Sequence, residues 1–406
     1  MTPVHIGIPV HDELDWLPHT LSALANQEDA HFKVWICVNQ PREYWNDPAH
    51  AEVTRSNQRT LSWLAETRFP FPLTLLAALE PDQAPPFKRA GVGWARRHLF
   101  DAISKTTSKQ SLCISLDADT HVPANYVAEI RRAFAACPNA VALAVPYYHP
   151  LPQDASAARH ILRYEIYLRY YQLSLWRIGS PYAYMPIGSG LAFRLDAYRR
   201  MGGMPPRKAG EDFYFLQQMR KIGPVIRWIN SRVEPAARPS ARNPFGTGPL
   251  MGEVDLSLQN KRYPFYAQQS FDRLRASFVL FPKLHETDIP MPIDDFLQGE
   301  RGGTAAFGRI RRNFADRGLF IKACHERMDG LRTLRFLRYE EARRGGGESD
   351  AFRVNALLEK LKKTPISLDF QTQSIDELDR VRNTLYAYES EFQQRFSENW
   401  DPKMRW

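Results

Sequence analysis

Cysteine and long apolar runs are both scarce in this sequence of 406 residues. Its four cysteines, Cys37, Cys113, Cys137 and Cys324, lie far apart and form no Cys-x-x-Cys pair. This spacing is typical of buried thiols in a reducing compartment. No stretch approaches the roughly 18 uninterrupted apolar residues of a membrane span, and the start MTPVHIGIPV lacks the basic patch and long apolar core of a signal peptide. We therefore expect a cytoplasmic protein.

Positive charge is concentrated in one part of the chain. The formal net charge is +9, and residues 300–344 hold twelve Lys or Arg against six Asp or Glu. A basic helical segment of this kind can attract anionic lipid or nucleic acid, although it is more often a solvated helix face. We expect no nucleic-acid partner, and peripheral association with the inner face of the plasma membrane stays open.

Strand and helix patterns alternate through the first part of the chain. Runs typical of buried strands are VHIGIPV, FKVWICV, PLTLLAAL, SLCISLD and AVALAVPY, and helix-length segments separate them. Strands joined by helices imply right-handed crossovers and a mainly parallel, doubly wound sheet of the α/β class. Beyond about residue 255, charged helical patterns take over. We therefore predict an α/β domain over residues 1–255 and a helical, basic region over residues 256–406.

Two carboxylates follow directly on one predicted strand. Asp117 and Asp119 come after the apolar run LCISL, where an unpaired carboxylate loses its hydration at a high free-energy cost. Ligands of doubly wound sheets bind outside the carboxyl ends of the strands. Mg²⁺ and Mn²⁺ prefer carboxylate oxygens, and Mg²⁺ often takes one or two of them together with substrate phosphates. With Lys88, Arg89 and Arg96 shortly before this strand, the pattern predicts a cation and a diphosphate here.

A second acid pair, Glu211 and Asp212, stands at the start of the predicted helix GEDFYFLQQMRKI. Acids at a helix N-terminus complement the helix dipole and cap free N–H groups, and for one acid alone this structural role is the simpler explanation. A pair that recurs after the Asp-x-Asp strand favours a shared site instead.

Over residues 3–255 the sequence resembles the bacterial family 2 glycosyltransferases, whose fold is called GT-A. The matching segments are GIPVHDE for the opening strand, GVGWARR for an Arg-bearing helix, SLDADT for the Asp-x-Asp motif, IGSGLAFR for the acceptor-side glycine turn and GEDFYF for the Glu-Asp motif. The segment PSARNPFGTG, with Ser240, Arg242 and Phe245, resembles a further loop of bacterial members. The resemblance implies a GT-A catalytic domain, with a Rossmann-like, mainly parallel sheet flanked by helices.

The resemblance also implies a reaction, namely inverting, hexosyltransferase-like transfer of a sugar from a nucleoside-diphosphate sugar to an acceptor hydroxyl in cell-envelope or surface glycan synthesis. Asp119 would bind a Mn²⁺ or Mg²⁺ ion that bridges the diphosphate, and Asp117 would contact that metal's water or the ribose. Asp212 would take the proton of the acceptor hydroxyl, and Glu211 would orient the acceptor. A cation assists departure of an anionic diphosphate, and a placed base assists attack by an alcohol.

Around the nucleotide sugar, the resemblance places nine residues. They are Pro9, His11, Glu13, Asn39, Arg89, Arg96, Asp117, Gly188 and Ser189. The family usually has Asp where this chain has Asn39, which can both donate and accept a hydrogen bond. UDP is the expected nucleotide, and a glycan or a lipid-linked molecule is the expected acceptor. Arg238 and Arg242 are expected either to clamp the diphosphate or to lie in a solvated loop.

Two other functions stay open at this point. An apolar strand followed by Asp-x-Asp-x-Thr also begins haloacid-dehalogenase-type phosphatases, with Asp117 as nucleophile and Asp119 as acid and base. That motif normally stands near the start of its domain, and it leaves GVGWARR and IGSGLAFR unexplained. The non-enzymatic alternative is an inactive glycosyltransferase-like scaffold at a membrane surface, against which the four intact motif acids argue.

Overall fold

The chain forms two compact units in a computed structural model that describes residues 2–238, 262–300, 302–303, 305–345 and 347–398. The first unit comprises the described residues within Met1–Ala157, Met185–Glu253 and Gln393–Arg405. The second comprises those within Ala158–Tyr184 and Val254–Phe392. The segment Ala158–Tyr184, which lies before the boundary that the sequence suggested near residue 255, thus packs with the second unit.

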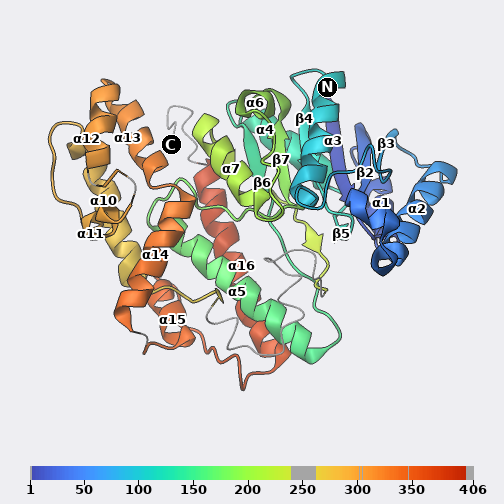
Figure 1. Ribbon diagram of the computed structural model, residues 1–406. Coiled ribbons are helices and arrows are strands. Elements are labelled where there is room, and N and C mark those ends of the chain that lie inside the picture. The colour runs from blue at the N-terminus through green and yellow to red at the C-terminus, as the bar shows by residue number, and fades with distance from the viewer. Residues whose placement is uncertain (1, 239–261, 301, 304, 346, 399–406) are drawn as a thin grey trace. The chain divides into compact units, whose positions relative to one another are not determined.

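Two sheets form in the described part of the first unit (Figure 1). The larger sheet contains β1 (Val4–Val10), β2 (Phe32–Asn39), β3 (Leu73–Ala78), β4 (Leu112–Ser115), β6 (Ala142–Ala144), β7 (Leu191–Arg194) and β8 (Val225–Ile226). Its strand order is β3-β2-β1-β4-β7-β6-β8. The smaller sheet is an antiparallel pair, β5 (Thr120–His121) with β9 (Glu234–Pro235).

The larger sheet is mainly parallel, as the sequence predicted. β3, β2, β1 and β4 run in one direction, and β6 is parallel to β8. β7 is the exception, because it pairs antiparallel with both β4 and β6. Side chains on both faces of the central strands are buried, such as Val34 and Ile36 on one face of β2 and Trp35 and Cys37 on the other, which explains the near-continuous apolar sequence.

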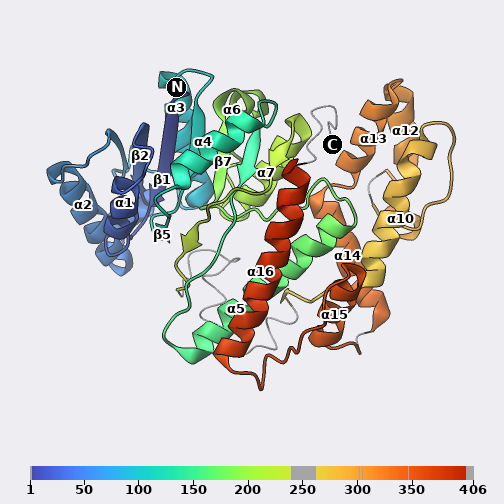
Figure 2. The ribbon, with the colours of Figure 1, turned by 180° about the vertical axis from the view of Figure 1, so that it is seen from behind.

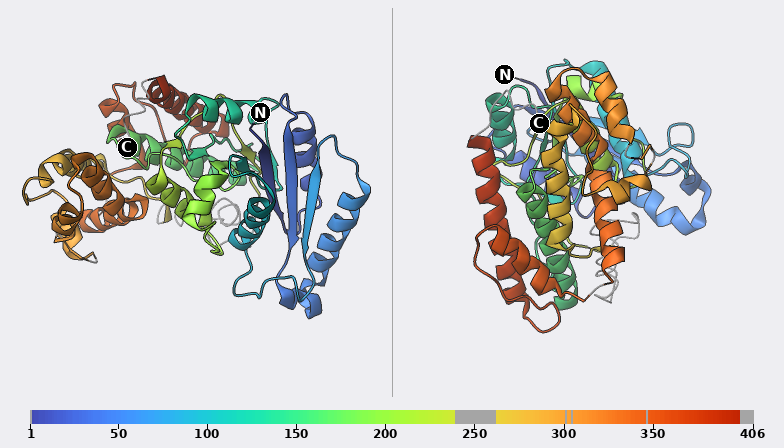
Figure 3. Two further views of the ribbon diagram at one scale, coloured as in Figure 1. Left: turned by 90° about the horizontal axis from the view of Figure 1, so that it is seen from above. Right: turned by 90° about the vertical axis from the view of Figure 1, so that its left-hand side faces the viewer.

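Helices flank this sheet on both faces. They are α1 (Leu17–Ala25), α2 (Ala51–Glu66), α3 (Val92–Thr106), α4 (Tyr126–Ala136), α6 (Leu195–Met201) and α7 (Glu211–Ile222), with short 3₁₀ helices η1 (Arg42–Asn46) and η2 (Pro48–His50). The left panel of Figure 3 shows α2 and α3 on opposite faces of the strands. The predicted α/β class, a mainly parallel sheet flanked by helices, is confirmed.

The second unit is helical throughout its described residues. It contains α5 (Ala155–Arg177), α10 (Gln268–Leu284), α11 (Asp294–Gln298), α12 (Ala305–Asn313), α13 (Arg317–Arg327), α14 (Gly330–Arg344), α15 (Asp350–Lys360) and most of α16 (Ile375–Glu398). The right panel of Figure 3 shows several of these helices with roughly aligned axes. The predicted helical C-terminal region is confirmed, and no helix in the described part of the chain is long and apolar enough to cross a membrane.

Buried ion pairs join α5 to α16, which lie side by side (Figure 2). The Arg169 guanidinium donates to Glu389 at 2.6 Å and also to Glu165, and all three side chains are almost completely buried. Removing one partner of such a group leaves an uncompensated charge in the interior. The arrangement therefore fixes which faces of the two helices meet.

Candidate active site

The carboxyl ends of β1 and β2 bring together three of the residues expected around the nucleotide. His11 follows β1, and its Nδ1 lies 2.8 Å from the main-chain oxygen of Asn39 at the end of β2. The side-chain Nδ2 of Asn39 donates to the main-chain oxygen of Val10 at 2.9 Å. Pro9 lies within β1, one residue before Val10. The strand pairing thus sets these side chains at one edge of the sheet.

Glu13 and Asp119 meet at the same edge around one guanidinium. Arg238 Nε donates to Asp119 Oδ2 at 2.9 Å, and Arg238 Nη2 donates to the Glu13 carboxylate. The Glu13 side chain is 8% exposed, while those of Asp119 and Arg238 are 21% and 22% exposed. The predicted metal ligand Asp119 therefore already has a cationic partner from this chain.

The short β5–β9 pair positions Arg238. Thr120 and His121 pair with Pro235 and Glu234, and the main-chain N–H of Ala236 donates to the main-chain oxygen of Asp119 at 3.1 Å. Because Asp119 precedes β5 directly, this pairing carries the chain after β9 back to the Asp-x-Asp motif. Sequence reasoning left the place of Arg238 open, since two-residue strands give no periodic signal.

A second guanidinium connects the two acid pairs. Arg96, in the first turns of α3, donates from Nη2 to Asp117 Oδ1 at 2.5 Å and from Nη1 to Glu211 Oε1. Its side chain is 3% exposed, and its Nε is buried without a hydrogen-bond partner. The sequence predicted contact of Arg96 with the nucleotide sugar. The structure places its two Nη atoms between acids that are far apart in the chain, and contact with the nucleotide sugar stays a prediction.

The missing side chain of Gly188 makes room for this guanidinium, and that of Gly93 makes room for the main chain of Arg207. A Cβ at Gly188 would stand 2.4 Å from Arg96 Nη2, and one at Gly93 would stand 2.2 Å from the main-chain oxygen of Arg207. Ser189, the other predicted residue of the glycine turn, is 1% exposed beside Gly188. Gly188 is therefore needed for packing against Arg96, a reason that the sequence motif alone does not reveal.

The Glu-Asp motif opens α7, as predicted. Glu211 is the first helical residue and follows Gly210, whose φ of 70° lies in the left-handed region. Glu211 is 2% exposed against Arg96, whereas Asp212 is half-buried and its Oδ1 accepts a hydrogen bond from the Phe213 main-chain N–H at 2.7 Å. The two neighbours thus differ, with Glu211 turned to the interior and Asp212 more open.

Burial and neighbouring acids shift the pKa values of this site. Loss of hydration, together with nearby Asp117 and Glu13, raises the pKa of Asp119 to about 6 in spite of Arg238. Burial also raises the pKa values of Glu211 and Asp212, and Arg96 opposes both shifts. Such shifts are typical of functional sites, although structural ion pairs produce them too.

The donor set fits a divalent cation that completes its shell with a ligand. In the described part of the chain, no group of three or more His, Cys, Asp or Glu side chains could hold a metal alone. Mg²⁺ nevertheless needs only one or two carboxylates when phosphate oxygens and water supply the rest. The carboxylates of Asp117 and Glu13 both act on the charge of Asp119, and Glu13 shares the Arg238 guanidinium with Asp119, so acidic oxygens already lie around one cationic group. Their formal charge exceeds that of Arg238, which favours a more highly charged cation.

Some predicted residues stand apart from this cluster. Arg89 and Lys88 are exposed in the loop before α3, and among the described residues no side chain pairs with Arg89. The segment PSARNPFGTG, with Ser240, Arg242 and Phe245, lies outside the described residues.

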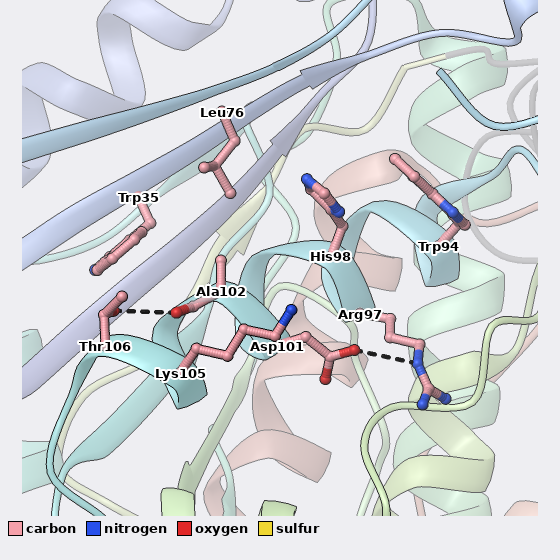
Figure 4. Close-up of a pocket in the computed structure, with 9 residues that line it drawn as sticks. All are labelled: Trp35, Leu76, Trp94, Arg97, His98, Asp101, Ala102, Lys105 and Thr106. Carbon is pink, nitrogen blue, oxygen red and sulfur yellow. Dashed lines mark hydrogen bonds and ion pairs between the residues drawn. The ribbon is translucent and has the colours of Figure 1, made fainter. Parts of the chain in front are cut away.

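A separate hollow of about 460 Å³ lies between α3 and the strands β2 and β3 (Figure 4). Trp35 and Leu76 from the strands face Trp94 and His98 from the helix, whose rings stack with centroids 4.9 Å apart. None of the predicted site residues lines it. Its lining combines two Trp rings with Arg97, Asp101 and Lys105, and so differs from the acidic edge described above.

Comparisons with known proteins give one family and a set of distant structures. Residues 112–277 match the family model described as glycosyl transferase family group 2. No curated protein matches the chain. Solved structures of Staphylococcus aureus TarS are similar: TarS 1–349 in complex with UDP-GlcNAc has 11% identity, covers 96% of this chain and 92% of that chain, and gives a TM-score of 0.40.

Two further TarS structures are similar at the same level. TarS 1–349 in complex with UDP has 11% identity over 86% of this chain and 92% of that chain, with a TM-score of 0.39. A structure entitled S. aureus TarS has 12% identity over 83% of this chain and 55% of that chain, with a TM-score of 0.37. At these TM-scores, the fold rests on the strand order of this chain. The matched segment, residues 112–277, carries both acid pairs, and this part of the chain is similar to the glycosyl transferase family group 2.

Proposed function

We propose that this glycosyltransferase moves a sugar, with inversion, from a nucleoside-diphosphate sugar to an acceptor hydroxyl at the edge formed by β1, β2 and β4. The observation that carries the proposal is the position of Arg96, whose guanidinium bonds both Asp117 and Glu211. It brings the Asp-x-Asp motif and the Glu-Asp motif into one site. Neither motif alone would support this function, because short acidic turns and helix caps are common.

Each acid has a separate part in this reaction. Asp119 and Asp117 would hold Mn²⁺ or Mg²⁺, which when bound would offset negative charge on the departing diphosphate. Asp212 accepts the proton of the acceptor hydroxyl as the acceptor oxygen bonds to the anomeric carbon. The bond from that carbon to the diphosphate oxygen breaks, and the diphosphate keeps the electron pair. Glu211, held by Arg96, orients the acceptor side of the site.

Asn39 supports a uracil base in spite of replacing the family's usual Asp. Its Nδ2 donates to the main-chain oxygens of Val10 and Cys37 at 2.9 and 3.4 Å, so its Oδ1 points the other way. No described group donates to that Oδ1, which can therefore accept the N–H of uracil as a carboxylate would. Pro9, His11 and Glu13 complete the nucleoside side, and Arg89, Gly188 and Ser189 stay in the proposed donor site. UDP sugars are the first donors to test.

The finer biological setting is also part of the proposal. We place residues 1–255 as the catalytic domain and residues 256–406 as a region that docks on it or on partners. A glycan or lipid-linked acceptor in envelope or surface glycan synthesis fits a cytoplasmic enzyme at the inner face of the plasma membrane. The phosphatase alternative is less suited to this site, because Asp117, its nucleophile, is bonded to Arg96.

The Asp212→Asn protein tests the base. Asn has nearly the same shape and caps helices about as well as Asp, but it removes the basic oxygen. Sugar transfer should fall by roughly 10²- to 10⁴-fold while the melting temperature changes little. Asp196→Asn, which alters an acid in the first turn of α6, is the matched control and should leave transfer unchanged. Transfer near the wild-type rate in Asp212→Asn would remove Asp212 as the base.

A thermal-shift screen identifies the donor. Nucleotide sugars are added with and without Mn²⁺, and a ligand that binds the native state raises the melting temperature by mass action. UDP sugars should give the largest shifts, and only with Mn²⁺. Shifts limited to simple aryl phosphates would favour the phosphatase alternative.

A further inference from the structure

Arg238 lies where two carboxylates from different strand ends converge. Its Nε and Nη2 both lie 2.9 Å from Asp119 Oδ2, and its Nη2 also contacts both oxygens of Glu13. Glu13 follows β1 and Asp119 follows β4, which pair side by side. One guanidinium therefore neutralises part of the charge that these two acids contribute to the sheet edge.

A divalent cation on Asp119 would compete with this guanidinium. Mg²⁺ binds carboxylate oxygens at about 2.0 to 2.1 Å and needs the lone pairs that Arg238 now uses. Two cationic groups within a few ångströms of each other also repel strongly in a partly buried site. The contact between Arg238 and Asp119 and the binding of a cation to the same oxygen therefore exclude each other.

The contacts of the Arg238 side chain allow it to move away from Asp119 and Glu13. Its side chain is 22% exposed and passes over the ring of Trp16 at 5.3 Å, and Trp16 is itself 40% exposed. Among the described residues, the main-chain bond of this segment to the Asp-x-Asp motif is from Ala236, two residues before Arg238. Rotation of one side chain thus frees Asp119 without breaking the β5–β9 pair.

We propose that Arg238 is a self-inhibitory gate, a built-in cation that occupies Asp119 and Glu13 in the ligand-free protein and that a divalent cation must displace before the donor can bind. The inference rests on the proposed function in one respect, the assignment of Asp119 as a cation ligand. Its consequence is that the free protein binds the cation more weakly than its carboxylates alone would. Activity then begins only when metal and diphosphate together outcompete an internal positive charge.

The test measures Mn²⁺ binding to the full chain by titration calorimetry, with no nucleotide present. Arg238→Gln should bind Mn²⁺ roughly tenfold more tightly than the wild type, because the competing charge is gone. Arg238→Lys keeps the charge but cannot bridge two carboxylates, so its affinity should fall between the two. Arg232→Gln, which removes a partner of Glu234 on the same segment, is the control and should bind like the wild type.

The outcomes separate the gate from the proposed function. Equal or weaker Mn²⁺ binding by Arg238→Gln, in a protein that melts like the wild type, overturns the gate while leaving Asp119 as a ligand. If Arg238→Gln melts early, Arg238→Lys decides, and affinity equal to the wild type again overturns the gate. Absence of Mn²⁺ binding in every protein, even with added UDP, contradicts both the gate and the metal role of the proposed function.

Discussion

Two arginines in this site each bridge a pair of acids, and they differ in burial. Arg96 joins Asp117 to Glu211 with a side chain that is 3% exposed. Arg238 joins Asp119 to Glu13 with one that is 22% exposed. The contact is similar in chemistry, so the difference lies in what surrounds it. Arg96 is enclosed by α3, α7 and the Gly188 turn, whereas Arg238 lies three residues after the two-residue strand β9.

This difference separates a fixed part of the site from an exchangeable one. Breaking a fully buried ion pair leaves an uncompensated charge in the interior, whereas a partly hydrated pair contributes less because water replaces part of the lost contact. Arg96 therefore holds the two acid motifs in register whether or not a ligand is bound. Arg238 stabilises its acids only until a competing cation arrives.

The largest expected effect tests this contrast directly. Arg96→Ala should lower the free energy of unfolding by about 3 to 5 kcal/mol, because Glu211 would lose its buried partner. The matched change Arg238→Ala should lower the free energy of unfolding by less than about 1 kcal/mol, since the side chains of Arg238 and Asp119 are partly hydrated. Urea unfolding of both proteins measures the difference. Equal losses would mean that burial does not distinguish the two arginines.

The next largest expected effect is the pH dependence of the free energy of unfolding that Asp119 contributes. Its pKa is raised from 3.8 to about 6 in the folded protein, so between these pH values the folded state holds a proton that the unfolded state has lost. The resulting stability is fully present below pH 3.8 and is lost as the pH rises through 6, by roughly 3 kcal/mol. Asp119→Asn cannot titrate and should lack this part of the decline. Parallel unfolding curves of wild type and variant between pH 4 and 7 would contradict the shift.

Gly188→Ala tests whether the close approach of Gly188 is needed to enclose Arg96. The new Cβ would stand 2.4 Å from Arg96 Nη2, so the guanidinium must move from its acids, at a cost of about 1 to 3 kcal/mol. Gly308→Ala in α12 is the control, because its Cβ would meet nothing closer than 3.8 Å. Calorimetric melting compares the two, and an unshifted melting temperature for Gly188→Ala would show that Arg96 tolerates displacement.

Much of the fold could be predicted from the sequence, and the pairing within the site could not. Apolar runs predicted the strands β1, β2 and β4, and the acid pair in GED predicted the start of the helix α7. The antiparallel direction of β7 has no local signal, because a four-residue apolar run reads the same in either direction. The sequence predicted Arg96 for the site, but it could not show that the guanidinium is enclosed, because that depends on the approach of Gly188 in three dimensions.

The position of Arg238 could not be predicted from the sequence for a related reason. Its contact with Glu13 depends on β5 and β9, two strands of two residues each, which no periodicity can reveal. The association of Ala158–Tyr184 with the C-terminal helices depends on buried charges such as Arg169 and Glu389, which a sequence shows only as scattered ionisable residues. The local sequence pattern thus does not predict which charged side chains pair when they are far apart in the chain.

Calorimetric titration of UDP into the wild-type chain, once with Mn²⁺ and once with EDTA, tests the central claim most directly. The account predicts binding with Mn²⁺ that weakens at least about tenfold in EDTA, and an Asp119→Ala protein that binds equally weakly in both. The cation would link the Asp-x-Asp motif to the diphosphate, so loss of either one should have the same effect. Equal UDP affinity of the wild type in Mn²⁺ and in EDTA would contradict the account.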